Sequence, residues 1–177
     1  MLLAAGPFSR PCGGLAPVAD IPIDGTRTLN RTEITYERTK TGWTMFEYTW
    51  KCAWGHADPQ GIAYYPRLVD AMHRAGEEYM VSVGHAYWDI PDDFGIHLPL
   101  VAVDLEFERP VEVEDELTIS VDPDVGTKSL GLEFVATHED GGTAFTGREQ
   151  HVCVSKAETE SQPLPDEIRD AIEASTD

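Results

Sequence analysis

The sequence contains few basic residues. Of its 177 residues, 13 are Lys or Arg and 32 are Asp or Glu, which gives a formal net charge of −19 at pH 7. Only four are lysine, at positions 40, 51, 128 and 156. A surface with this charge repels nucleic acids and anionic membranes, so neither is expected as a partner. The acidity fits an ordinary soluble protein and equally fits adaptation to high salt.

Cysteine and long apolar runs are also scarce. The three cysteines, Cys12, Cys52 and Cys153, show neither metal-site nor redox-motif spacing, which favours a reducing compartment. Cys52 and Cys153 have strand-like neighbours and are expected in the core. Residues 1–5 are too short for a signal peptide, and no apolar run reaches the length of a membrane span. The sequence therefore predicts a cytoplasmic protein.

Several common catalytic signatures are missing as well. The sequence contains no phosphate-binding loop, dinucleotide-binding fingerprint or serine nucleophile elbow. Its six histidines and three cysteines do not follow a ligand spacing. These absences argue against a catalytic metal, against serine-based hydrolysis and against a bound cofactor.

The most informative stretch that is present runs over residues 54–84. Its first half is a tight loop that holds Asp58 between glycines and a proline. In its second half, apolar residues recur every three or four positions, which predicts a helix over residues 66–83 with one buried face. Pro66 suits the first turn of this helix and Gly84 its end. The loop thus brings Asp58 to a helix N-terminus, where free N–H groups favour an oxyanion.

Alternating apolar and polar residues predict the strands. One strand precedes the loop and four follow the helix, with short connections that require antiparallel pairing. Asp122 to Gly126 are expected to form a turn, and Gly147 a bulge or a close approach. The predicted fold class is α+β, with one long helix wrapped by a curved antiparallel sheet. The predicted strands cover residues 46–52, 101–107, 117–121, 130–136 and 143–155.

Three segments are expected along the chain. Residues 1–42 contain scattered Pro and Gly and predict a flexible extension, with at most a short strand at 34–36. Residues 43–160 form the domain. Residues 161–177 form a tail with a short amphipathic helix over 166–174.

The loop and helix start contain the motif Asp58-Pro59-x-Gly61-Ile62-x-Tyr64-Tyr65-Pro66. This motif closely resembles the active-site segment of the 4-hydroxybenzoyl-CoA thioesterase family of hotdog-fold proteins. A second segment, Gly126 to Ser129, is similar to the family's connection near the CoA moiety, and the resemblance covers about residues 45–155. It implies a hotdog fold and an acyl-CoA thioesterase, with coenzyme A present only as part of the substrate.

The resemblance also implies roles for individual residues. Asp58 is the expected base or nucleophile, whereas the plainer interpretation is that it caps a turn or helix. The backbone N–H of Tyr65 is expected to polarise the thioester carbonyl, and Gly61 to let the chain approach the ligand. His56 departs from relatives that carry an acid there; it is either a surface residue or a group that orients water.

The remaining expectations concern binding. Lys128 and Ser129 match positions near the nucleotide or pantetheine, and Thr127 offers a backbone N–H to a phosphate. The family forms its active sites between subunits, so a homodimer or homotetramer is expected. His73 is expected at the helix surface or an interface. Two alternatives stay open: a hydratase or dehydratase acting on acyl thioesters, and an acyl-CoA-binding module without turnover.

Overall fold

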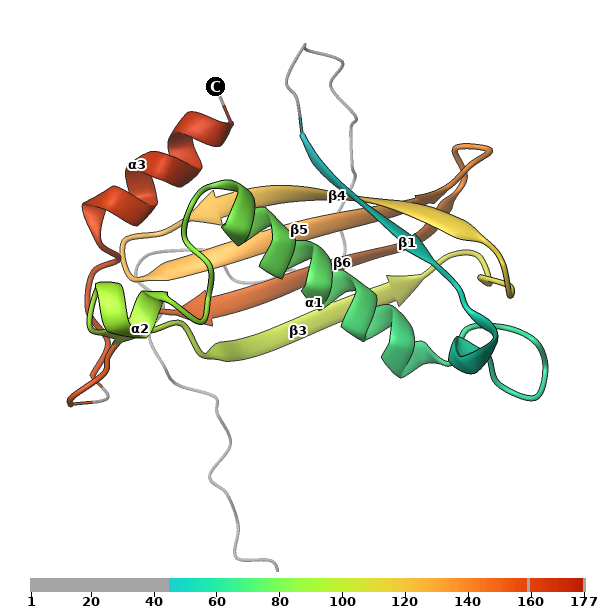
Figure 1. Ribbon diagram of the computed structural model, residues 1–177, viewed down its shortest axis with the longest axis horizontal. Coiled ribbons are helices and arrows are strands. Elements are labelled where there is room, and N and C mark those ends of the chain that lie inside the picture. Colours follow the sequence, from blue (N-terminus) through green and yellow to red (C-terminus); the bar gives the residue numbers. More distant parts are fainter. Residues whose placement is uncertain (1–44, 159, 177) are drawn as a thin grey trace, which may run out of the picture. The chain divides into compact units, whose positions relative to one another are not determined.

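The computed structural model describes residues 45–158 and 160–176 (Figure 1). The predicted extension over 1–42, its possible strand and Cys12 lie outside these residues. No helix in the described ranges is long and apolar enough to cross a membrane. The elements are β1 (Phe46–Lys51), the 3-10 helix η1 (Trp54–His56), α1 (Tyr65–Ser82), α2 (Ile90–Asp93), β2 (Ile96–His97), β3 (Leu100–Phe107), β4 (Glu116–Val125), β5 (Ser129–His138), β6 (Thr143–Val152), β7 (Val154–Ser155) and α3 (Asp166–Ser175).

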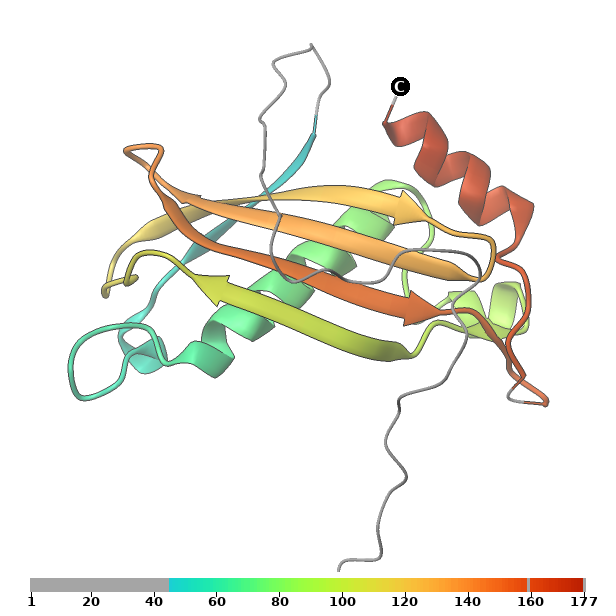
Figure 2. The ribbon, with the colours of Figure 1, turned by 180° about the vertical axis from the view of Figure 1, so that it is seen from behind.

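Five strands form one antiparallel sheet in the order β1-β4-β5-β6-β3. Helix α1 lies along one face of this sheet, in front of it in Figure 1 and behind it in Figure 2. The predicted α+β class, with one long helix against a curved antiparallel sheet, is confirmed. The helix begins at Tyr65 and ends at Ser82, one residue before each predicted limit.

The core lies between α1 and the sheet. Apolar side chains on one face of α1 are buried at the predicted spacing, among them Leu68, Met72 and Tyr79. Cys52 and Cys153 are fully buried, as predicted. Helix α3 starts at the predicted residue and buries Ile168 and Ile172.

Two glycines let α1 lie close to the sheet. A Cβ atom on Gly147 of β6 would overlap the Met72 sulfur and lie 2.9 Å from Leu105 Cδ1. A Cβ atom on Gly76 of α1 would lie 3.0 Å from Leu132 Cδ1. The predicted close approach at Gly147 is confirmed, and the contact sets how near the helix sits to the strands.

The predicted turn at Asp122 to Gly126 is wrong in its first part. Strand β4 continues to Val125, with Pro123 opposite Leu132 of β5. Proline is tolerated here because, in the part of the chain that the structure describes, β1 pairs with β4 only as far as Val121, so the missing N–H of Pro123 breaks no described ladder on that side. The turn itself is shorter, and the N–H of Gly126 donates to the Ser129 carbonyl at 2.9 Å.

Two further differences concern residues 85–97 and 143–155. The connector after α1 contains α2, which the sequence does not predict. The predicted last strand divides into β6 and β7, because the chain leaves the main sheet after Val152 to pair with β2. Strand β3 lies at the edge of the main sheet, and its Leu100, Val101, Val103 and Phe107 side chains are exposed.

We expect Gly147→Ala to destabilise the fold. The new methyl group has no room between Met72 and Leu105, and overpacking of this kind typically costs about 1–3 kcal/mol. Gly55→Ala is the control, because nothing lies within 4 Å of a Cβ atom at that position. Urea unfolding measures both variants; equal midpoints for the two would contradict the tight helix–sheet contact.

Candidate active site

The Asp58 loop is a compact turn closed by its own backbone. The N–H of Asp58 donates to the Ile62 carbonyl at 2.8 Å, and the N–H of Gly61 donates to the Asp58 carbonyl at 3.0 Å. Gly61 has φ +86°, a left-handed conformation that favours glycine. Gln60 N–H donates to Asp58 Oδ1 at 2.8 Å, which orients the carboxylate within the turn.

The same loop is fixed at both ends to residues 111–115, which connect β3 to β4. Ala63 N–H donates to the Val111 carbonyl at 2.7 Å. At the other end, Cys52 N–H donates to the Asp115 carbonyl at 2.9 Å, and Glu114 N–H donates to the Cys52 carbonyl at 2.8 Å. The position of Asp58 therefore depends on this connection as well as on its own turn.

Helix α1 starts directly after the loop. Tyr64 is its N-cap residue, and its N–H donates to the His56 carbonyl at 2.8 Å. Tyr65 is the first helical residue, and its N–H has no hydrogen-bond acceptor within the described part of the chain. An unpaired N–H at the positive end of an 18-residue helix is suited to an anionic oxygen. The Tyr64 and Tyr65 side chains are both exposed and pack edge to face, with ring centroids 5.2 Å apart.

His56 has a local structural contact. Its Nδ1 accepts a hydrogen bond from the Ala53 N–H at 3.0 Å, and its ring stacks on Trp50 with centroids 5.1 Å apart. These contacts hold the η1 turn that precedes Asp58. The structure therefore brings together four of the predicted residues, which are His56, Asp58, Gly61 and Tyr65.

The three predicted CoA-binding residues lie elsewhere. Thr127, Lys128 and Ser129 follow the end of β4, whereas the Asp58 loop adjoins its start, where Lys51 pairs with Glu116. The ten residues of β4 separate these ends by roughly 30 Å. Both ribbon views show the loop and the β4–β5 turn at opposite ends of the sheet (Figures 1 and 2). One protomer does not bring the two predicted groups of residues together.

Sequence reasoning missed a buried polar cluster under α1. Glu149 of β6 is 1% exposed, and its carboxylate lies 3.1 Å from His73 Nδ1 on α1 and 3.5 Å from His151 Nε2. His151 Nδ1 contacts the Leu98 carbonyl at 3.0 Å, and the Tyr87 hydroxyl lies 3.4 Å from His151 Nε2. The one available signal was a glutamate at an inward position of a predicted strand. Its partner His73 is 76 residues away and cannot be found from spacing.

Charge pairing shifts the pKa values of Glu149 and His73 in opposite directions. Burial alone would raise the pKa of Glu149, but hydrogen bonds from His151 and His73 lower it below its ordinary value. The hydrogen bond to Glu149 raises the pKa of His73, against the opposing effect of burial. Burial raises the pKa of the Tyr87 phenol, which therefore stays protonated. The cluster accordingly favours an ionised Glu149 beside a protonated His73.

A comparison of sequences identifies the family. The profile of the thioesterase-like superfamily matches residues 52–172, from the residue after β1 into α3. The chain belongs to this superfamily. Membership confirms the predicted hotdog thioesterase family and, with it, the prediction of a thioester hydrolase.

Named relatives agree with this assignment. The chain is 27% identical over 124 residues to the 1,4-dihydroxy-2-naphthoyl-CoA hydrolase of Nostoc punctiforme, covering 70% of this chain and 83% of that protein. A solved thioesterase-superfamily structure from Jannaschia sp. is 26% identical with a TM-score of 0.68, over 74% of this chain and 92% of that one. The 1,4-dihydroxy-2-naphthoyl-CoA thioesterase of Synechocystis has the same fold at 22% identity and a TM-score of 0.68, covering 72% and 95% of the two chains.

We expect Glu149→Gln to destabilise the fold most between about pH 4.5 and 6.5. The lowered pKa of Glu149 adds stability above its ordinary value of 4.5, which is lost as pH falls through the folded-state pKa. The raised pKa of His73 adds stability below its ordinary value of 6.5, which is lost as pH rises through the folded-state pKa. Urea unfolding across this range checks the expectation, with the exposed Glu78→Gln on α1 as control. If the difference in unfolding free energy between wild type and variant does not change with pH, the charge pairing is ruled out.

Proposed function

We propose that this protein hydrolyses the thioester of an acyl-CoA, with Asp58 and the Tyr65 N–H at the reacting group. The observation that carries the proposal is the adjacency of the two: a carboxylate on a rigid turn directly precedes a helix start with an unpaired N–H. A positioned carboxylate and an oxyanion donor are the two groups that acyl transfer requires. The superfamily assignment supports the same reaction.

The reaction proceeds through attack on the thioester carbon. Asp58 either removes a proton from a water molecule, whose oxygen then bonds to the carbonyl carbon, or bonds to that carbon itself. The Tyr65 N–H donates to the carbonyl oxygen as it gains negative charge, an interaction typically worth about 2.7–4 kcal/mol. The carbon–sulfur bond breaks and coenzyme A leaves as the thiolate. In the nucleophilic route, water then cleaves the resulting anhydride and restores Asp58.

A second copy of the chain completes the proposed site. Strand β3 runs from Leu100, near the Lys128 turn, to Phe107, near the Asp58 loop, and it forms an exposed apolar edge. Antiparallel pairing of two such edges about a two-fold axis sets the Leu100 end of each beside the Phe107 end of the other. The partner's Lys128 turn then lies at the same end of the joined sheet as this protomer's Asp58. Binding of CoA by Thr127, Lys128 and Ser129 is thus proposed to occur across subunits.

The charge of CoA is compatible with an acidic protein under this arrangement. The Lys128 side chain is exposed and contacts only the Ser161 carbonyl, at 3.4 Å, among the described residues. Its ammonium group is therefore available to an anion. The curated relatives are named for an aromatic acyl-CoA, so aryl-CoA esters belong in the first substrate panel beside aliphatic ones.

Asp58→Asn should lower thiol release from an acyl-CoA at least about a hundredfold in kcat, because the amide neither takes a proton nor attacks the carbonyl carbon. Thiol-reagent absorbance on a panel of aliphatic and aryl CoA esters measures this. The matched control is Asp93→Asn, an exposed residue of α2. Full activity in the Asp58 variant would exclude its role, and hydration of an enoyl-CoA without thiol release would favour the hydratase alternative.

Mixing two impaired variants tests the shared site. Lys128→Ala should mainly raise KM, and Asp58→Asn should mainly lower kcat. After subunit exchange in a 1:1 mixture, half of the dimers carry one chain of each kind, and each of these has one site with both residues intact. At low substrate concentration we therefore expect about a quarter of wild-type activity. If the mixture is no faster than the mean of the two separate variants, the shared site is excluded. Either both residues then act within one protomer, or Lys128 does not belong to the site.

A further inference from the structure

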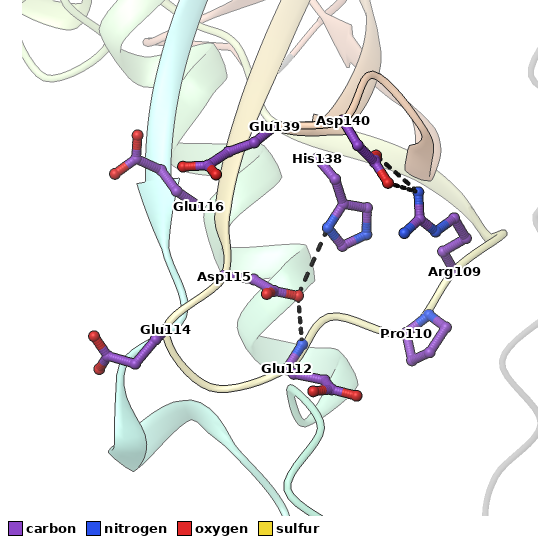
Figure 3. Close-up of a pocket in the computed structure, with 9 residues that line it drawn as sticks. All are labelled: Arg109, Pro110, Glu112, Glu114, Asp115, Glu116, His138, Glu139 and Asp140. Atoms are coloured by element: carbon purple, nitrogen blue, oxygen red, sulfur yellow. Dashed lines mark hydrogen bonds and ion pairs between the residues drawn. The ribbon is translucent and has the colours of Figure 1, made fainter.

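A pocket adjoins residues 111–115, the segment that holds the Asp58 loop in place. It has a volume of about 460 Å³ and lies where residues 109–116 face the β5–β6 hairpin (Figure 3). This volume is within the range of small-molecule sites. Nothing in the proposed thioester chemistry uses it.

The pocket is lined with more negative than positive charge. Of its carboxylates, Asp140 pairs with Arg109 at 2.9 Å, and Glu114 pairs with Lys51 at 2.7 Å. No cation within residues 45–158 and 160–176 lies within 4 Å of the Glu112, Glu116 or Glu139 carboxylate. These three groups stay exposed around the opening. The lining therefore favours a positively charged ligand.

His138 gives an independent indication of a ligand. Its side chain is 10% exposed and lines the pocket, between Asp115 and Arg109 in Figure 3. Its Nδ1 faces Asp115 at 3.6 Å, whereas its Nε2 is buried and has no hydrogen-bond partner. With the proton on Nδ1, directed at the carboxylate, Nε2 is an acceptor that lacks a donor. An N–H group of a ligand would satisfy it.

The arrangement of the acids distinguishes among cations. In the described part of the chain, no three His, Cys, Asp or Glu side chains converge closely enough to hold one metal ion. The carboxylates are instead distributed around the pocket (Figure 3). Separated acceptors suit a ligand whose positive charges are also separated along a chain, and each charged N–H then bonds to a different carboxylate.

We propose that this pocket binds an extended organic cation with several ammonium groups, such as a linear polyamine. Ammonium groups bond to Glu112, Glu116 and Glu139, and one N–H donates to His138 Nε2. Glu112, Glu114 and Asp115 line this pocket, and carbonyls of the same segment, at Val111 and Asp115, accept the Ala63 and Cys52 N–H groups at the two ends of the Asp58 loop. A bound cation therefore holds this segment and, through it, the loop.

Calorimetric titration of the full chain with spermidine in 150 mM KCl tests binding, since this salt screens a diffuse ion atmosphere. We expect one saturable site that Glu139→Gln and His138→Phe each weaken at least about tenfold. Glu173→Gln on α3 removes an equal charge elsewhere and leaves the affinity unchanged. Magnesium titrated alone should show no site that depends on Glu139.

Hydrogen exchange measures the effect on the loop without using activity. Saturating spermidine should slow exchange of the Cys52 and Ala63 amides in the wild type and not in Glu139→Gln. Thermal unfolding checks that each variant is folded. Glu139 is exposed in the β5–β6 hairpin, so Glu139→Gln is expected to fold and still tests the site if His138→Phe does not fold. Three outcomes would each overturn the proposal. The first is non-saturating spermidine binding that Glu173→Gln weakens as much as Glu139→Gln does. The others are magnesium binding at the same Glu139-dependent site and amide exchange that spermidine leaves unchanged.

Discussion

The contact between α1 and the sheet determines where the candidate site lies. Met72 packs where Gly147 has no side chain, and Gly76 lies against Leu132, so the helix axis is held close to β5 and β6. With its height and position fixed, the helix starts at the end of the sheet where β1 ends and the Asp58 loop begins. A helix displaced by one side-chain layer would carry the Tyr65 N–H away from that loop. Core packing thus supplies the geometry that a positioned carboxylate and an oxyanion donor need.

A buried carboxylate is unusual beneath such a helix, and its neighbours explain why it is tolerated. Glu149 would be costly alone in an apolar core, but His73 and His151 both face it and Tyr87 closes the cluster. The cluster links α1, β6 and the chain after α1 through directional contacts. The polar contacts therefore add specificity to the helix position that Gly147 permits.

Local patterns in the sequence predicted the local parts of the structure. The helix over Tyr65–Ser82 follows from its apolar period and from Pro66, and the Asp58 turn follows from its glycines and proline. The predicted turn at Asp122 was wrong because Pro123 suggested a break in the strand. Among the described residues, Pro123 lies past the last pair between β1 and β4, so β4 continues through it. The Glu149–His73 contact joins residues distant in sequence, and no local pattern reveals it. The separation of Lys128 from Asp58 likewise depends on the length and order of the strands.

The strong negative charge does not conflict with an anionic substrate, because electrostatic effects here are short-ranged. At physiological salt the Debye length is about 8 Å, so a bound CoA interacts mainly with groups beside it. An exposed lysine and the N-terminus of α1 each present positive charge at that range, whereas most carboxylates are screened. A nucleic acid would have to contact many acidic residues at once, so the absence of a nucleic-acid partner stays a prediction of the charge alone. A net charge of −19 is therefore compatible with the proposed binding of a small anion at a few local positions.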